Sequence, residues 1–301
     1  MKSWIILLCA VMTLWADKKL EVVASVPDLA DMARQIGGDA VNVISLATGR
    51  EDLHAVPARP SFLPKLNKAD LLLTLGLDAE HAWLPALAEE ARNPKIRQDG
   101  SGWIDCSKGI DVLGKPQKLD RSEGEQHPEG NPHYSIGPQC GVTVATNIEK
   151  AFSEALPSKA EYFAQNAQTY KARIESLVMD LKTQGNALRG VAIIEYHPDV
   201  VYLSAFYGMK TIGSIEPKAG VPPTAGHLKT LEQTARENNV NIIVYNQSQN
   251  PKIPQKLAMS IGCKAVQIAN AVGAQPQITT WIELQRYNLE VLLEELAGAG
   301  K

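Results

Sequence analysis

Apolar and polar residues alternate along the first part of the chain in a pattern that predicts short buried strands separated by amphipathic helices. Strands are expected at Leu20–Val26, Val41–Leu46 and Leu71–Leu75, and helical spacing covers Asp28–Ile36 and Pro60–Lys68. The run of apolar residues in the third strand is typical of a strand buried on both faces of a parallel sheet. This alternation of strand and helix indicates an α/β fold.

The middle of the chain has a different character. Residues 114–138 are rich in Gly, Pro and charge, which predicts an irregular loop. Two helices are expected after it, at Val142–Ala155 and Ser158–Gln184, with Ser158 as the N-cap of the second. At 1.5 Å per residue the second helix would be about 40 Å long, which is enough to connect two lobes.

The β/α alternation then restarts. Strands are expected at Val191–Tyr196, Lys210–Ile215, Ile242–Tyr245 and Ala265–Ile268, and helices at Gly226–Asn238, Ile253–Ser260 and Trp281–Leu296. The chain therefore reads as an N-terminal α/β lobe at 17–156, a long linker helix at 157–188 and a C-terminal α/β lobe at 189–301. Open α/β sheets bind ligands beyond the carboxyl ends of their strands, so functional residues are expected there.

The first 16 residues read as a secretory signal peptide. Lys2 precedes the short apolar run Trp4–Trp15, and Ala16 precedes the charged Asp17–Lys19. The run is too short to span a bilayer comfortably, and the alternative interpretation is a buried N-terminal helix. Leu14 is an imperfect residue three positions before the expected cut, so the exact cleavage site stays open. A cleaved signal predicts a periplasmic protein.

Export permits disulfides in the mature chain. Cys106, Cys140 and Cys263 would remain, and Cys106 and Cys140 could pair because both lie in the first half. Three buried thiols are an equal alternative, since Cys is among the most buried residue types. The formal net charge of -3 gives no indication of nucleic acid or an anionic membrane surface as a partner.

Histidines carry the candidate chemistry. His54, His133 and His197 stand after predicted strands or in Pro-rich loops, next to acidic or turn residues. Neutral imidazole is a good ligand for Zn²⁺, and three imidazoles make most of a tetrahedral site. Because the three lie far apart in sequence, the fold would have to assemble such a site; ordinary surface histidines are the alternative. His81 and His227 are interpreted as structural or solvated.

His127 lies in the acidic loop Glu123–Glu129 and is interpreted mainly as a solvated loop histidine. This loop position could also collect metal loosely.

Around these histidines the sequence resembles the periplasmic zinc/manganese-binding proteins of bacterial ABC importers, over nearly all of the mature chain. The matching segments are His54 with the stretch up to Ala69-Asp70 and Gly76–Glu80, Gly130–Pro138 around His133, Tyr196-His197-Pro198 through Gly208, and Ile215–Pro223. The resemblance implies two α/β lobes joined by a long rigid helix, with the metal held between the lobes. It also implies an inner-membrane permease as partner, with a cytoplasmic ATPase behind it.

The sequence departs from the family pattern at two points. Ser135-Ile136-Gly137 replaces the usual Trp and acidic residue of the second motif, and Asn270 stands where the family commonly has an Asp or Glu as fourth ligand. Asp52, Glu216 or water could supply that fourth position instead. Three imidazoles with no assured carboxylate favour zinc over manganese, which prefers oxygen ligands, and copper, nickel and cobalt stay chemically possible.

The resulting prediction is a monomeric binding protein rather than an enzyme. A zinc hydrolase would need a placed general base, and neither a His-Glu-x-x-His nor a Gly-x-Ser-x-Gly motif is present. A binding protein for an organic or chelated solute should offer aromatic walls, yet aromatic residues make up only 6% of the chain. Both stay open as alternatives, as does a surface adhesion role.

Overall fold

Two four-stranded sheets organise the computed structural model, which describes residues 18–118, 124 and 126–298. The first sheet has the order β2-β1-β3-β4, and all of its neighbouring strands are parallel. Its strands are β1 (Leu20–Ala24), β2 (Val41–Ser45), β3 (Leu71–Thr74) and β4 (Trp103–Asp105). All four residues of β3 are buried, as its uniformly apolar sequence predicts for a strand covered on both faces.

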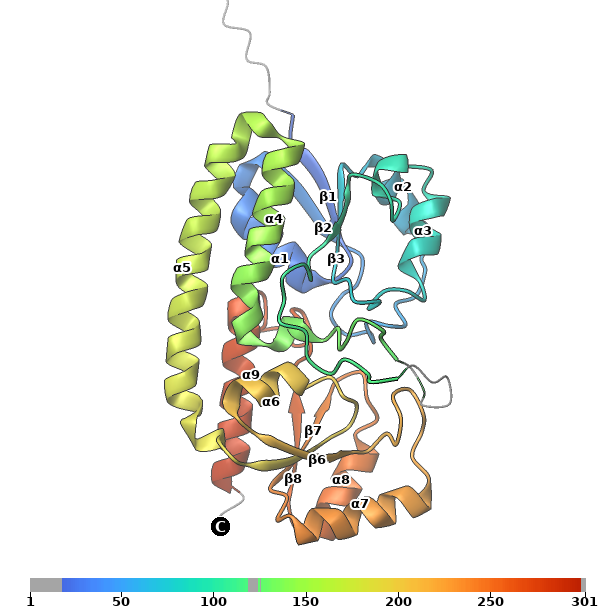
Figure 1. The fold of residues 1–301 in the computed structure, drawn as a ribbon, viewed down its shortest axis with the longest axis vertical. Helices are drawn as coiled ribbons and strands as arrows, with labels where there is room; N and C mark the ends of the chain where they lie inside the picture. The colour runs from blue at the N-terminus through green and yellow to red at the C-terminus, as the bar shows by residue number, and fades with distance from the viewer. Residues whose placement is uncertain (1–17, 119–123, 125, 299–301) are drawn as a thin grey trace, which may run out of the picture.

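Helices cover this sheet on its two sides (Figure 1). On one side α1 (Pro27–Gly37) and α4 (Gly141–Ala155) pack together, and on the other lie α2 (Leu63–Lys68) and α3 (Leu84–Glu90). The core between them is mainly aliphatic and continues into the second lobe through α9.

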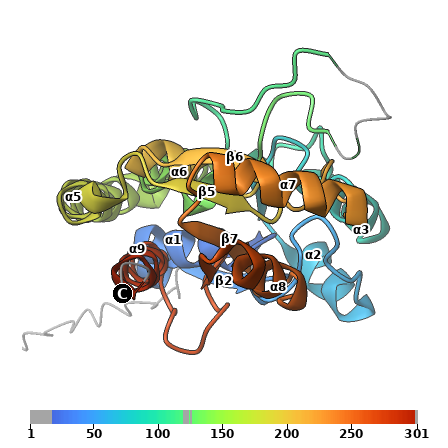
Figure 2. The same ribbon diagram turned by 90° about the horizontal axis from the view of Figure 1, so that it is seen from below.

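The second sheet repeats the first plan, with the order β6-β5-β7-β8 and parallel neighbours. Its strands are β5 (Ala192–Glu195), β6 (Lys210–Ser214), β7 (Ile242–Asn246) and β8 (Lys264–Ile268). The helices of this lobe are α6 (Val201–Tyr207), α7 (Ala225–Glu237), α8 (Lys252–Ile261) and α9 (Trp281–Gly298). Figure 2 shows α7 and α8 side by side, at some distance from α9.

One long helix, α5 (Ala160–Gln184), runs alongside both lobes (Figure 1). Its buried side chains recur every three or four residues, at Phe163, Ala167, Tyr170, Ile174, Leu177 and Leu181. It packs on α4 and α1 in the first lobe and on α9 in the second. The predicted N-cap was wrong: Ser158 lies inside a 3-10 turn, Pro157–Lys159. Helix α5 follows this turn directly, and Lys159 is its N-cap.

Two carboxylates of α1 hold the segment that follows β8. Asp31 Oδ2 accepts the backbone N–H of Trp281 at 2.8 Å, and Asp28 Oδ2 accepts that of Val272 at 3.4 Å. Burial raises the pKa of Asp28 to about 7 and raises that of Asp31 above its ordinary value. Gly49 lies so close that a Cβ there would meet the Val272 carbonyl oxygen at 1.9 Å. These contacts fix the second lobe against the first.

The two-lobed α/β fold with its long helix is therefore confirmed, while the division into 17–156, 157–188 and 189–301 stays a prediction. The sequence pattern missed α3, β4 and α6, all of which are short. Cys106 and Cys140 are free and buried, so the structure favours thiols over a bridge between them; Cys263 is free and partly exposed. The expected signal peptide lies outside the described residues. No described helix is long and apolar enough to cross a membrane.

Candidate metal centre

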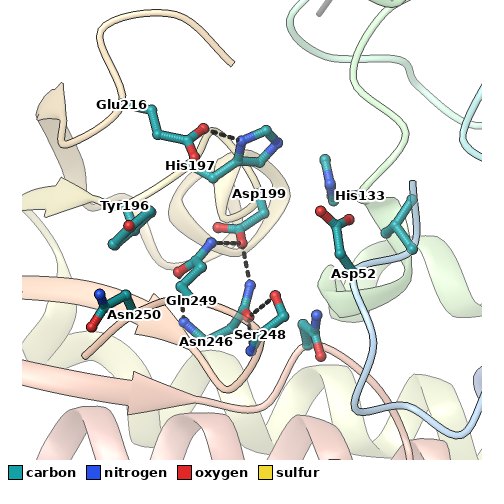
Figure 3. Close-up of a pocket in the computed structure, with 12 residues that line it drawn as sticks. Asp52, His133, Tyr196, His197, Asp199, Glu216, Asn246, Ser248, Gln249 and Asn250 are labelled. Atoms are coloured by element: carbon teal, nitrogen blue, oxygen red, sulfur yellow. Dashed lines mark hydrogen bonds and ion pairs between the residues drawn. The ribbon is translucent and has the colours of Figure 1, made fainter. Parts of the chain in front are cut away.

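Three imidazoles meet where the two lobes face each other. His54 follows β2, His133 opens the 3-10 turn Tyr134–Ile136, and His197 follows β5. One ring nitrogen from each lies within 4.8 Å of the others. His54 and His133 are buried and His197 is half-buried. Figure 3 shows His133 and His197 bordering one cavity from opposite lobes.

Hydrogen bonds fix the tautomers of His54 and His133. His54 Nδ1–H donates to the Ala79 carbonyl oxygen at 3.0 Å, and His133 Nδ1–H donates to Asn131 Oδ1 at 3.1 Å. Because both acceptors are oxygens that cannot donate, the proton of each neutral ring stays on Nδ1 and the lone pair on Nε2. The two Nε2 atoms lie 3.1 Å apart.

That short separation needs a cation or a proton between the two nitrogens, since facing lone pairs repel. Two imidazole nitrogens bound tetrahedrally to Zn²⁺, each about 2.0–2.1 Å from the ion, would lie about 3.3 Å apart. The observed spacing is close to that value, so His54 and His133 are arranged as a pair of metal ligands would be.

His197 is held by a carboxylate. Its Nδ1–H donates to Glu216 Oε2 at 2.8 Å (Figure 3). The same oxygen accepts the Gly220 N–H at 2.9 Å. A carboxylate on the second ring nitrogen fixes the orientation of metal-ligating histidines and makes them better donors. Glu216 is therefore placed to orient His197, and it borders the same cavity as Asp52 and Asn270.

The pKa values of His197 and His133 are shifted in opposite directions. Burial alone would lower the pKa of His197, but the hydrogen bond to Glu216 and the charge of Asp199 outweigh it and raise that pKa. For His133, burial and the neighbouring His54 and His197 hold the pKa well below 6.5. His133 thus stays neutral and able to donate a lone pair at lower pH than His197.

Asn131 joins the two lobes at the site. Its Oδ1 accepts both the backbone N–H of His133, at 2.9 Å, and the ring Nδ1–H. Its Nδ2 donates to the Pro198 carbonyl oxygen at 2.5 Å, directly after His197. One side chain therefore sets the positions of ligand-bearing segments from both lobes.

A polar cavity of about 180 Å³ opens beside the three imidazoles. The lining includes the carboxylates of Asp52 and Asp199 together with several amides of the second lobe. Asp199 Oδ2 accepts from Asn246 Nδ2 at 2.6 Å and from Gln249 Nε2 at 3.0 Å (Figure 3). Carboxylate and amide side chains thus line the cavity beside the three imidazoles.

Asn270 and Asp52 border this cavity, but each already has a hydrogen bond. Asn270 Oδ1 accepts from Gln247 Nε2, which also donates to the Gly49 carbonyl oxygen at 2.8 Å. Asp52 Oδ1 accepts the backbone N–H of His54 at 2.9 Å. An amide oxygen engaged in this way would have to give up a bond to reach a metal ion.

The remaining histidines have distinct surroundings. His227 Nε2–H donates to the Ser214 carbonyl oxygen at 3.0 Å, a structural role of the kind expected. His81 is exposed, and its Nδ1–H donates to the Asp78 carbonyl oxygen at 2.7 Å. The interpretation of His127 as mainly solvated was wrong: its ring is half-buried and stacks on His54 with 4.9 Å between centroids. Burial, then the neighbouring imidazoles, lower its pKa to about 4.

Sequence reasoning missed the groups that hold the imidazoles. Asn131 had a usable signal, because an Asn two residues before a ligand can bond back to the following backbone. No sequence signal marked the Ala79 carbonyl oxygen, since every residue has a backbone carbonyl. Glu216 was considered only as a ligand, although carboxylates beside metal-binding histidines commonly orient them.

A two-lobed α/β protein with an imidazole site between its lobes is the class that this geometry defines. The family model for the zinc-uptake complex component A periplasmic (ZnuA) matches residues 22–295, and the chain belongs to this family.

Relatives with related names extend over nearly the whole chain. It is 23% identical over 290 residues to the manganese ABC transporter substrate-binding lipoprotein PsaA of Streptococcus mitis, covering 94% of this chain and 91% of PsaA. It is 24% identical over 286 residues to the high-affinity zinc uptake system protein ZnuA of Bacillus subtilis (strain 168), covering 92% and 88%.

Solved structures share the fold. A crystal structure of ZnuA superposes with a TM-score of 0.77 at 23% identity, covering 93% of this chain and all of that one. A cadmium-bound periplasmic metal-binding protein from Candidatus Liberibacter asiaticus superposes with a TM-score of 0.77 at 21% identity and the same coverage.

Proposed function

We propose that this chain is the exported substrate-binding protein of an ABC importer, and that it captures a divalent transition-metal ion on His54, His133 and His197. The proposal rests on one observation above all. His54 and His133 have their Nδ1 protons fixed on oxygen acceptors, and their Nε2 atoms lie 3.1 Å apart. Family membership and the metals named for PsaA and ZnuA support it.

Zinc is the favoured ion and manganese the next. Imidazole suits borderline ions such as Zn²⁺, whereas Mn²⁺ prefers oxygen ligands. The fourth position goes to Asn270, Asp52, Glu216 or water, with Asn270 the residue that the family pattern suggests. The cation would be the cargo of the protein and not a catalytic group, and we infer that the chain is not an enzyme.

An inner-membrane permease would receive the ion, and the protein would act as a monomer in the periplasm after removal of residues 1–16. Several relatives are named lipoproteins, so an anchored form of the mature chain is the alternative to a freely diffusing one.

The test is a metal titration of the mature protein after chelator stripping, with zinc and manganese in competition against a chromophoric chelator. We expect one tightly bound equivalent that prefers zinc, and its loss in His54→Ala, His133→Ala and His197→Ala. The control is His227→Ala, which removes an imidazole that lies outside the three-histidine cluster and bonds to the Ser214 carbonyl oxygen; this variant should bind as the native protein does. Native protein with no tight equivalent, or variants that retain it, would contradict the proposal.

A further inference from the structure

Two tryptophan side chains donate hydrogen bonds to the backbone beside the ligand histidines. The indole Nε1–H of Trp83 donates to the Leu53 carbonyl oxygen at 2.9 Å, and that of Trp281 donates to the Ser135 carbonyl oxygen at 2.7 Å. Both rings are buried, with 5% of Trp83 and 1% of Trp281 exposed. Because indole has one polar atom, which can only donate, each ring directs its single hydrogen bond at a segment that carries an imidazole.

The planar peptide unit between Leu53 and His54 is held at both ends. Its carbonyl oxygen accepts the Trp83 N–H, and its own N–H donates to Asp52 Oδ1 at 2.9 Å. The imidazole of His54 is held separately, by the Ala79 carbonyl oxygen at 3.0 Å. Different groups therefore fix the backbone and the ring of this histidine.

The segment around His133 is held in part from the second lobe. The His133 N–H donates to Asn131 Oδ1 at 2.9 Å. Two residues further along, the Ser135 carbonyl oxygen accepts from two side chains of α9, Trp281 Nε1 at 2.7 Å and Gln285 Nε2 at 3.0 Å. Gln285 is fully buried, like the indole beside it. The short stretch from His133 to Ser135 is thus fixed at both of its ends.

The packing of Trp281 makes its indole a rigid donor. Its backbone N–H donates to Asp31 Oδ2 of α1 at 2.8 Å. Its ring lies against the first residue of α4, so close that a Cβ on Gly141 would meet Cη2 at 2.4 Å. Because the ring is enclosed by well-packed helices, the core of the protein sets the position of its N–H.

Such support is needed because the Nε2 atoms of His54 and His133 lie 3.1 Å apart. While both rings are neutral and no ion lies between them, their facing lone pairs repel, and the backbone must resist their separation. Binding groups have to be held to within about 0.5 Å of the productive geometry by the residues around them. If either segment relaxed, an arriving ion would first have to draw the two imidazoles together, and affinity would fall.

We propose that Trp83 and Trp281 are positioning residues for the metal site: each uses its indole N–H to hold the backbone beside one ligand histidine, and so keeps the imidazole pair arranged for an ion before it arrives. Trp83 acts on His54, and Trp281 acts on His133. The proposal rests on the proposed function, since it takes zinc binding by these histidines as given.

The test combines zinc affinity with nitrogen NMR spectra of the imidazole rings in metal-free mature protein. Trp83→Phe and Trp281→Phe each remove the N–H and keep an aromatic ring. Loss of groups that support metal ligands costs about 10–100-fold in affinity, and we expect about tenfold in each variant because the indoles act through the backbone. The ring signals of His54 alone should change in Trp83→Phe, and those of His133 alone in Trp281→Phe.

The matched control is Trp103→Phe, which makes the same change in β4, the edge strand at the opposite side of the first sheet from β2. It should resemble native protein in both measurements. Metal-free melting temperatures check that each variant folds. If Trp281→Phe does not fold, Gln285→Met removes the other donor to the Ser135 carbonyl and should likewise affect His133 alone. Trp83→Met serves in the same way at the other position, since Met fills irregular gaps in a core.

Unchanged zinc affinity in a folded variant would overturn the role of that tryptophan. The proposal would also be wrong if affinity fell while the ring signals of all three ligand histidines changed together, or while none changed, because a general structural role predicts the first and an effect outside the site predicts the second. Failure of the proposed function looks different: native protein itself would then lack a tightly bound zinc ion.

Discussion

The carboxylate of Glu216 should control how tightly His197 holds a metal ion, and Glu216→Gln tests this. Gln keeps an oxygen able to accept the Nδ1 hydrogen bond, now 2.8 Å long, but removes the negative charge. Loss of such a second partner costs about 10–100-fold in metal affinity, or about 1.4–2.7 kcal/mol. We expect zinc binding at pH 8 to weaken by that factor.

The same carboxylate also stabilises protonated His197, so the size of the effect should depend on pH. The pKa of His197 in native protein is raised, and a proton therefore competes with the metal as the pH falls through that value. One pH unit below the pKa, this competition costs about tenfold in affinity. In Glu216→Gln the pKa of His197 is lower, so protons compete with the metal only at a lower pH. The difference in zinc affinity between the two proteins should therefore narrow from pH 8 to pH 6.

The assay is competition for zinc with a chromophoric chelator at pH 8, 7 and 6. Glu232→Gln makes the same chemical change in α7, at a side chain paired with Arg236 and away from the site, and should bind as native protein does. Equal affinity of Glu216→Gln and native protein at pH 8, or a difference that grows as the pH falls, would refute this account of His197.

Three further outcomes follow from the site. Zinc at a hundredfold excess over its dissociation constant should stabilise native protein by about 2.7 kcal/mol, and His133→Ala should lose most of the accompanying rise in melting temperature; an equal rise would remove His133 from the ligands. Asn270→Asp should improve manganese affinity more than zinc affinity in calorimetry, because a carboxylate favours the harder ion; no change in either would mean that this side chain stays with Gln247. Asn131→Ala should cost about 1–3 kcal/mol of stability in urea unfolding, since it leaves the buried acceptor and donor groups around His133 and Pro198 unpaired.

Local patterns in the sequence predicted the two-lobed architecture and its longer elements. Strands such as Leu71–Leu75 are uniformly apolar because helices cover both faces of a parallel sheet, and this signal lies within a few residues of chain. The periodic apolar residues of α5 likewise predicted a long helix that buries one of its faces. Short elements such as β4, with three residues, present too few positions for any periodicity to be read.

For the site, the sequence could name His54, His133 and His197 as candidates, because imidazoles after strands are recognisable locally and family motifs surround them. Only the tertiary structure decided which nitrogen of each ring is available. That choice depends on the Ala79 carbonyl, on Asn131 and on Glu216, which come from other segments of the chain. The place of His127 against His54 was equally invisible, since 73 residues separate them and only folding brings their rings together. The sequence determines which residues are histidines. Which ring nitrogen of each histidine carries the free lone pair is set by hydrogen-bond partners that the fold supplies.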